Sequence, residues 1–435
     1  MWRTLVIGLA LATPLAAQEF FTLKGHGGPI MGIAVSPQGQ IATASFDNSV
    51  GLWRATNPRW LEGHRAAVTA LNFDLGSVLL SGGDDFRVLR WDTDSDLPTE
   101  VTQHLGKVSA IAVSPQGPII ASAGWDGFIN ITKLVQDDVS SDDPETTVLK
   151  GHRSNVTAVA YDRSGRLFSA SSDGTLRVWE GTSPTLSPRV LVKHGFGINK
   201  IVVTEDWIAY GAVDGGTRIV DPETGEQISD FTLDRRPILS MAYHAQTQQL
   251  AVGDGEGYIM VIDTGKMRIS RDFRATRNGP IWALAFSVDG QNLHAGGIED
   301  IVYSWPIATM DQHGTMAGTP RSFLEKPETL SNGERQFKRK CSICHTLTQG
   351  SARKAGPSLH QLFGRRAGTV ADYTYSETLN GSDIIWSAET INALFDLGPD
   401  HYIPGTKMPM QRIVKQSDRD DLITYLRENT AQGED

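Results

Sequence analysis

The chain has 435 residues, and its 40 Lys and Arg side chains against 50 Asp and Glu give a formal charge of −10 at pH 7. At about 150 residues per domain, this length predicts two or three folded units. The acidic balance argues against nucleic acid as a partner, because phosphate binding needs clustered cations. Cys341 and Cys344 are the only cysteines, and two thiols this close together exclude a disulfide-stapled scaffold.

The start of the chain has the composition of an export signal. One Arg in residues 1–3 precedes an apolar run at residues 5–12, and Pro14 and the small residues Ala16 and Ala17 follow. The run is too short for a membrane span, which needs about 20 apolar residues, and no other segment approaches that length. We therefore expect residues 1–17 to be a cleaved signal peptide, with no membrane insertion. A buried N-terminal helix is the alternative.

A repeated pattern fills the next part of the chain. An acidic residue precedes a Trp by six positions in four places, and a Gly-His pair opens several of the units. The four pairs are Asp47 and Trp53, Asp85 and Trp91, Asp173 and Trp179, and Glu299 and Trp305. In three further copies the acidic residue remains, at Asp126, Asp214 and Glu256, while another residue replaces the Trp. These are seven units, 38 to 47 residues apart, with short β-branched runs typical of strands.

Residues 151–179 run from a Gly-His pair through a Ser-Asp-Gly turn to a Val-Trp pair, and they closely resemble a repeat of the WD-repeat propeller family. The resemblance covers about residues 20–306. It implies an all-β, seven-bladed propeller over residues 18–307, whose last blade is completed by residues 21–23 as an N-terminal strand. It also implies a structural hydrogen-bonded set within one blade, made by His152, Ser169, Asp173 and Trp179.

Other conspicuous residues of the repeats receive weaker predictions. His194, His244 and His294 lie at scattered positions with no carboxylate or Cys at ligand spacing, so no metal site is expected. Phe46 and Trp125 each precede the acidic turn residue of their unit. They are either exposed anchors for a partner protein or packing residues between blades.

The periodicity ends at about residue 308, where a linker over residues 308–323 and a further domain over residues 324–435 are predicted. Within that domain, Cys341, Cys344 and His345 form a C-x-x-C-H pattern, the signature of c-type haem attachment. Two thiols with this spacing can add to the two vinyl groups of one haem, and the adjacent imidazole can reach the iron. A redox-active or zinc-binding pair is disfavoured by the following His and by the absence of a second C-x-x-C.

Residues 330–430 resemble class I cytochrome c, an all-α fold, over nearly their whole length. The resemblance places Gly333 and Phe337 on a helix that packs against the C-terminal helix, near Tyr425. It implies that the carbonyl of Pro357 accepts a hydrogen bond from the His345 ring, which raises the basicity of this axial ligand. One covalent haem c is the expected cofactor.

The same resemblance supplies the rest of the haem site. A Tyr-Ile-Pro-Gly-Thr-Lys-Met run makes Met408 the expected second axial ligand, with Met410 as the rival. Three further residues match positions that hold the haem propionates in the family, namely Arg365, Tyr375 and Trp386. The sequence departs from the mitochondrial pattern at Phe395, where a Tyr would stand near the methionine.

These features favour an electron carrier over an enzyme in its own right, and no catalytic residue is assigned. His/Met ligation fills both axial positions of the iron, so no site is left for a substrate. We expect an exported, periplasmic c-type cytochrome that performs outer-sphere electron transfer and docks a redox partner protein through its propeller. Residues 308–435 carry 15 basic and 16 acidic side chains, whereas residues 1–307 carry 25 and 34. The cations expected to surround the haem edge and to meet acidic partners are Lys340, Arg353, Lys354 and Lys407.

Two alternatives stay open at this point. The chain resembles, in overall layout only, the nitrite reductases that join a cytochrome to a propeller, so a periplasmic oxidoreductase with a further cofactor or substrate site in the propeller is the first. The second is a haem sensor of redox state or of a small ligand such as CO, which requires that Met408 dissociate readily from the iron.

Overall fold

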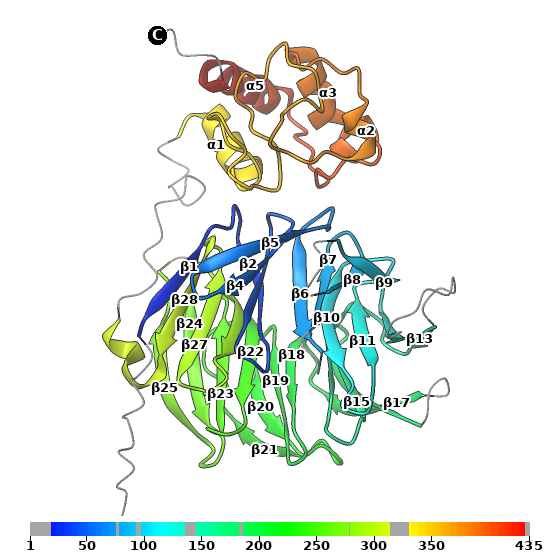
Figure 1. Cartoon of the computed structure of the whole chain (residues 1–435), viewed down its shortest axis with the longest axis vertical. Coiled ribbons are helices and arrows are strands. Elements are labelled where there is room, and N and C mark those ends of the chain that lie inside the picture. The colour runs from blue at the N-terminus through cyan, green and yellow to red at the C-terminus, as the bar shows by residue number, and fades with distance from the viewer. Residues whose placement is uncertain are drawn as a thin grey trace, which may run out of the picture.

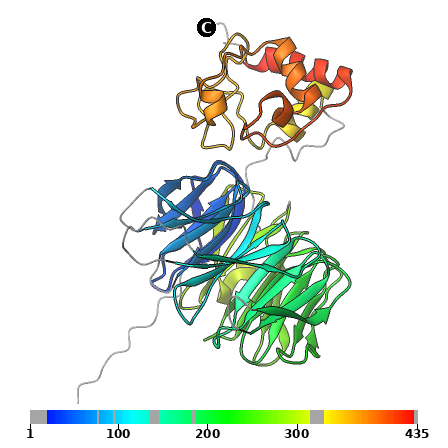
Figure 2. The same ribbon diagram turned by 90° about the vertical axis from the view of Figure 1, so that its right-hand side faces the viewer.

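A computed structural model describes residues 19–74, 78–92, 97–134, 145–181, 186–277, 279–313 and 330–430. The predicted signal peptide and most of the predicted linker therefore lie outside the described residues. A large β unit carries a smaller helical unit at one end, above the strands drawn in blue (Figures 1 and 2). No described helix is long and apolar enough to cross a membrane.

The β unit consists of seven four-stranded antiparallel sheets, numbered here as blades 1 to 7, which confirms the predicted propeller. Blades 1 to 4 are β2–β5 (Ile30–Val35, Ile41–Ser45, Ser49–Arg54, Asn57–Glu62), β6–β9 (Val68–Phe73, Leu79–Gly83, Arg87–Trp91, Thr99–Gln103), β10–β13 (Val108–Val113, Ile119–Gly124, Phe128–Lys133, Thr146–Lys150) and β14–β17 (Val156–Tyr161, Leu167–Ser171, Thr175–Glu180, Ser187–Lys193). Blades 5 to 7 are β18–β21 (Ile198–Val203, Ile208–Ala212, Thr217–Val220, Gln227–Asp230), β22–β25 (Ile238–His244, Gln249–Asp254, Tyr258–Asp263, Arg268–Arg274) and β26–β28 (Ile281–Phe286, Asn292–Gly297, Ile301–Pro306) with β1 (Phe21–Lys24).

The N-terminal strand closes the ring. β1 pairs with β28 in antiparallel register, from Phe21 opposite Ser304 to Lys24 opposite Ile301. This confirms the strand predicted to complete the last blade, and it covers a sheet edge that would otherwise be free to pair with another chain.

The propeller buries its apolar residues between neighbouring blades. The second and third strands of each blade are mostly buried, and in β7 all five residues are buried. One cluster joins β3 and β4 of blade 1 to β7 and β8 of blade 2 through residues such as Val50, Leu79 and Trp91. Each blade therefore shares its apolar core with its neighbours.

A hydrogen-bonded set locks blade 4 as the sequence predicts. The Nδ1 atom of His152 lies 3.0 Å from Asp173 Oδ2, and its Nε2 atom lies 2.7 Å from Ser169 Oγ. The same hydroxyl accepts a hydrogen bond from Trp179 Nε1 at 2.9 Å. Burial lowers the pKa of His152, so the ring is neutral at pH 7 and can donate to the carboxylate while it accepts from the serine hydroxyl. Blades 1 and 2 repeat the set with His26, Thr43, Asp47 and Trp53, and with His64, Ser81, Asp85 and Trp91.

Two further histidines bind the turn carboxylate of their blade, although the sequence analysis did not predict it. His104 Nδ1 lies 3.0 Å from Asp126 Oδ2 in blade 3. His194, which the sequence placed among scattered histidines with no carboxylate at metal-ligand spacing, lies 2.9 Å from Asp214 Oδ1 in blade 5. The separations of 22 and 20 residues resemble the 21 residues between His152 and Asp173, and this spacing was the available signal. His244 and His294 do not pair with a carboxylate through any described hydrogen bond, and bind Thr247, Val288 and Ser304 instead.

The helical unit contains α1 (Asn332–Lys340), α2 (Glu377–Asn380), α3 (Ala388–Leu397), α4 (Pro399–Tyr402) and α5 (Gln416–Thr430), and the 3-10 helix η1 (Ile307–Gln312) follows the propeller. Ser331 caps α1 by accepting a hydrogen bond from the Glu334 N–H. α1 packs against α5, where a Cβ on Gly333 would collide with the main chain of Asp421. Phe337 and Tyr425 meet there with their ring centroids 5.6 Å apart. This close crossing holds the start of the C-x-x-C-H segment in place.

Candidate functional site

A cavity of about 1440 Å³ opens in the helical unit and reaches the loops of the propeller that face it. Its walls include Cys341, Cys344, His345 and Met408, so the four residues with the strongest predicted roles line one space. The cavity also takes in apolar side chains of the helical core, such as Leu394 and Leu426. A mostly apolar space of this size with a few polar groups is typical of a site for a large organic cofactor.

The His345 ring is held in one orientation by its neighbours. Its Nδ1 atom lies 2.8 Å from the carbonyl oxygen of Pro357, the bond that the sequence anticipates, and this leaves Nε2 for another partner. Gly356 packs against the ring so closely that a Cβ there would lie 2.7 Å from Nδ1 and 2.8 Å from Nε2. Burial lowers the pKa of His345, so the ring is neutral at pH 7. A neutral, oriented imidazole is the form that binds a metal.

The two cysteines are separate thiols at the same end of the cavity. They are not joined to each other, and both are buried. Burial raises the pKa of Cys341 to about 12 and that of Cys344 to about 11, so neither is a thiolate at neutral pH. α1 ends at Lys340, and a turn follows in which the main-chain N–H groups of Cys344 and His345 both bond the Cys341 carbonyl, at 3.0 and 2.9 Å. Two thiols and one imidazole beside a cavity of this size fit a covalently attached haem.

The two candidate methionines lie in different environments. Met408 lines the cavity and packs against the helical core, near the buried Phe395. Met410 does not belong to the cavity lining and is 51% exposed, and its sulfur lies beside Gly398. The main chain therefore turns Met408 inward and Met410 outward.

The three residues predicted to hold propionates all line the cavity. The Arg365 guanidinium donates hydrogen bonds to the carbonyls of His360 and Ser358, at 2.5 and 2.8 Å. The Tyr375 hydroxyl accepts a hydrogen bond from the Val370 N–H at 3.3 Å. The main-chain N–H of Trp386 donates a hydrogen bond to the Arg365 carbonyl at 3.0 Å, which joins these two residues directly. Burial lowers the pKa of Arg365, but the group remains a cation facing the cavity.

The mouth of the cavity faces the propeller. Residues 46–49, 62–67, 84 and 85 from blades 1 and 2 contribute to its lining, together with Lys340, Arg353, Lys354 and Lys407 of the helical unit. The cations that the sequence assigns to external partners therefore lie beside the chain's own acidic loops. Phe46 is half-buried at this mouth, whereas Trp125 is 51% exposed, with the Lys107 amine 5.0 Å from its ring centroid. No local sequence pattern reports that these cations lie beside the propeller loops, because the residues involved, such as Arg353 and Glu62, are 291 positions apart.

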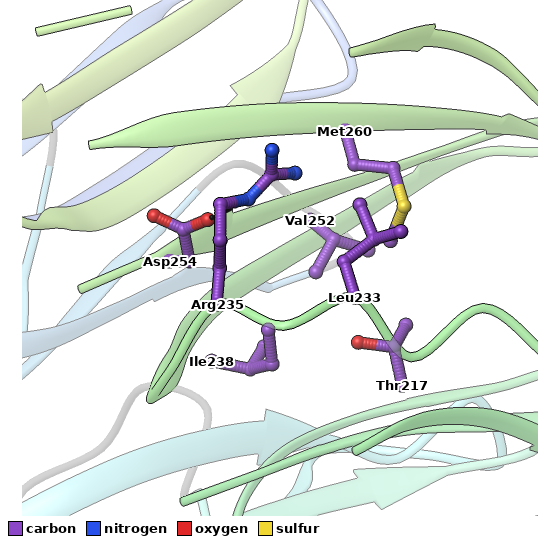
Figure 3. A pocket seen from close by; sticks show the side chains of 7 residues that line it. All are labelled: Thr217, Leu233, Arg235, Ile238, Val252, Asp254 and Met260. Atoms are coloured by element: carbon purple, nitrogen blue, oxygen red, sulfur yellow. Dashed lines mark ion pairs between the residues drawn. The ribbon is translucent and has the colours of Figure 1, made fainter. Parts of the chain in front are cut away.

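A second cavity, in the propeller, is much smaller (Figure 3). Its volume is about 10 Å³, and it is lined by Thr217, Leu233, Arg235, Ile238, Val252, Asp254 and Met260. Arg235 and Asp254 form an ion pair there, with Nε and Oδ2 2.9 Å apart. The space holds about one water molecule and is too small for a cofactor. Within the described ranges, no group of three or more His, Cys, Asp or Glu side chains gathers as a metal site requires.

Fold and cavity together define a protein with a helical haem-binding unit mounted on a seven-bladed propeller. The cytochrome c family model matches residues 330–430, and the WD domain, G-beta repeat model matches residues 17–54, 56–92, 96–132 and 144–180. Cytochromes c of Nigella damascena and Cannabis sativa are each 45% identical to the chain over 113 residues, which cover 25% of this chain and 99% of each relative. Cytochrome c of Arabidopsis thaliana is 45% identical over 98 residues, 22% of this chain and 87% of the relative. The chain belongs to the cytochrome c family and carries WD repeats ahead of its cytochrome domain.

Family membership confirms the predicted cofactor, a covalently bound haem c, and Cys341 and Cys344 fit its attachment site. The function that follows at this level is electron transfer based on haem, with the propeller as a scaffold for protein interaction. The alignment with the Nigella and Cannabis cytochromes covers 99% of each relative but only 25% of this chain. The propeller therefore has no counterpart in these two relatives.

Proposed function

We propose that the protein is an exported electron-transfer protein whose single covalent haem has His345 and Met408 as axial ligands. The observation that carries the proposal is the placement of both side chains in the lining of one cavity, with Met410 outside it. When bound, the haem supplies an iron that changes its charge by one electron. His and Met ligation keeps that iron closed to substrates and favours a high potential.

The protein's own residues limit the rearrangement that accompanies a change of charge. Pro357 fixes the imidazole through its carbonyl, and Gly356 leaves the ring no room to turn. Arg365 is itself anchored by two main-chain carbonyls, which keep its positive charge in one position at the cavity wall. A buried, preorganised site of this kind suits outer-sphere electron transfer, because little must move when the charge changes.

In this proposal the propeller brings the cytochrome domain to a particular redox partner protein. Several apolar side chains are exposed on the loops at the propeller end that carries the cytochrome domain, and burying them would stabilise a complex. They include Leu105, Trp125 and Phe196, which are 82%, 51% and 60% exposed. A tethered haem next to a docked partner has a high effective concentration at that partner.

Export to a bacterial periplasm belongs to the same proposal. Its support is the sequence pattern of residues 1–17 together with the haem attachment motif at residues 341–345. Intact mass measurement of the protein from a periplasmic extract should give a mature chain that begins after Ala17. A full-length chain confined to the cytoplasm contradicts export.

The ligand assignment is tested by absorption spectra of protein made in a host that attaches haem c. We expect a pyridine haemochrome count of one per chain and a weak charge-transfer band near the red end of the oxidised spectrum. Met408→Ala should abolish that band and allow the reduced protein to bind CO, whereas Met410→Ala, the matched control, should leave both unchanged. Loss of the band in the Met410 variant alone would reverse the assignment. A second chromophore would favour an oxidoreductase instead.

A further inference from the structure

The side chain of Arg353 in the cytochrome domain makes two kinds of contact with the propeller. The Arg353 Nη2 atom lies 2.8 Å from Glu62 Oε1, and the guanidinium lies 4.2 Å from the centroid of the Trp60 ring. The Trp60 ring packs edge-on against the buried His26 ring, with the two ring centroids 4.7 Å apart. Arg353 therefore binds a rigid part of blade 1 through both its charge and its planar face.

Where the cytochrome domain approaches, the propeller has a glycine at a position that carries a larger residue in blades 2, 3 and 4. In blades 2, 3 and 4 the residue after the locking histidine is Arg65, Leu105 or Arg153, and its N–H binds the turn carboxylate at 2.8 to 3.0 Å. In blade 1 the same position, with the same hydrogen bond at 2.8 Å, is Gly27. A Cβ on Gly27 would collide with the main chain of Arg353, and would lie 2.5 Å from the carbonyl oxygen of the preceding residue.

Nothing in the blade itself requires this glycine. The backbone at Gly27 is not in the left-handed region, and the equivalent positions of three other blades carry large side chains. The missing side chain is explained by the approach of the cytochrome domain, where residues Ala352 and Arg353 both have left-handed backbones, with φ of 47° and 53°. Both sides of the contact therefore have a local structure that permits the close approach: a glycine on the propeller and a left-handed backbone on the cytochrome domain.

We propose that the loops of blades 1 and 2 are a built-in docking site for the rim of the haem cavity, and that an external redox protein reaches this rim only when the contact opens. This inference rests on the proposed electron-transfer function. Glu62 on the propeller pairs with Arg353. Asp84 and Asp85, which pair with Lys107 and Arg87 of the propeller, line the same cavity as Lys340 and Lys407. An acidic external partner therefore competes with the propeller for the cations at the mouth.

The first test measures the contact without reference to electron transfer. Small-angle X-ray scattering of the full-length holoprotein should show a larger maximum dimension for Gly27→Ala than for the wild type, because the added methyl group forces the domains apart. Gly381→Ala is the steric control, since its Cβ would meet nothing within 4 Å. Arg353→Gln removes the ion pair and the stacking contact, and it should shift the equilibrium toward the open form by about tenfold. Arg189→Gln, which breaks an ordinary surface pair with Glu180, should not.

The second test measures access to the cavity. One electron passes from the reduced protein to oxidised plastocyanin, an acidic protein, giving oxidised cytochrome and Cu(I). We expect Gly27→Ala to accelerate this reaction about tenfold, and oxidation by the small ferricyanide ion to change less than about twofold. Identical scattering and identical plastocyanin rates for Gly27→Ala and wild type would overturn the docking site. Absence of covalent haem would instead overturn the proposed function, and the scattering result would still decide the docking.

Discussion

The fit of Gly356 against the His345 imidazole leads to a quantitative prediction for Gly356→Ala. The new Cβ would lie 2.7 Å from Nδ1 and 2.8 Å from Nε2 of His345, well inside normal contact distance. To relieve this, the ring must move by roughly 0.6 to 1 Å, which breaks its 2.8 Å hydrogen bond to the Pro357 carbonyl. Overpacking costs about 1–3 kcal/mol and the lost hydrogen bond about 1 kcal/mol, so we expect a loss of about 2–4 kcal/mol.

Thermal unfolding of the holoprotein, followed by absorption at the haem, measures this loss. For a domain of about 100 residues it corresponds to a midpoint lower by roughly 10–20 °C. The oxidised spectrum should also acquire a high-spin component as the imidazole moves. Gly381→Ala is the control, because the same added methyl group meets no neighbour. If Gly356→Ala unfolds at the wild-type temperature with an unchanged spectrum, the ring does not occupy the position described here.

Two further predictions concern the propeller. Burial alone would raise the pKa of Asp173, but hydrogen bonds from Thr175, the Arg153 N–H and His152 outweigh it and lower that pKa from 3.8 to about 2. Stability from this carboxylate is present above pH 3.8 and is lost as the pH falls toward 2. Other propeller carboxyls, such as Asp47 and Asp85, also have lowered pKa values, so chemical denaturation should show a loss of stability over this range that is about 2 kcal/mol smaller in Asp173→Asn than in wild type. Trp179→Phe removes a hydrogen bond to Ser169, whereas the buried Trp305 Nε1 has no hydrogen-bond partner among the described residues. Denaturation midpoints should therefore show Trp179→Phe to be about 1–2 kcal/mol more harmful than Trp305→Phe, and equal losses would contradict the hydrogen-bond argument.

The sequence was sufficient for the fold because each blade repeats its own local rules. The six-residue spacing of Asp173 and Trp179 is set within one blade, between a turn and the strand that follows it, so it can be read without knowing the rest of the ring. The lock of blade 5 was missed for a related reason. Lys193 replaces the Gly before His194, and Val220 replaces the Trp, so only the distance to Asp214 remained as a signal.

The haem site was predictable to the extent that its residues are close in sequence. Cys341, Cys344 and His345 are neighbours, and the carbonyl that holds the ring lies only 12 residues further on. The contact of Arg353 with Glu62 joins residues 291 positions apart, and no local pattern reports such a pairing. The cations that we expected to meet external partners were therefore assigned from their charge alone, because the sequence does not show that Glu62 lies next to Arg353.

Closure of the ring by β1 also affects the order in which the protein is made. β1 is among the first folded segments to leave the ribosome, yet its partner β28 follows about 280 residues later. The growing chain must therefore keep this strand without its native partner during synthesis, and it can close the propeller only after the last blade has been made. The cytochrome domain is synthesised after that blade, so the propeller can be complete before the cytochrome domain has acquired its haem.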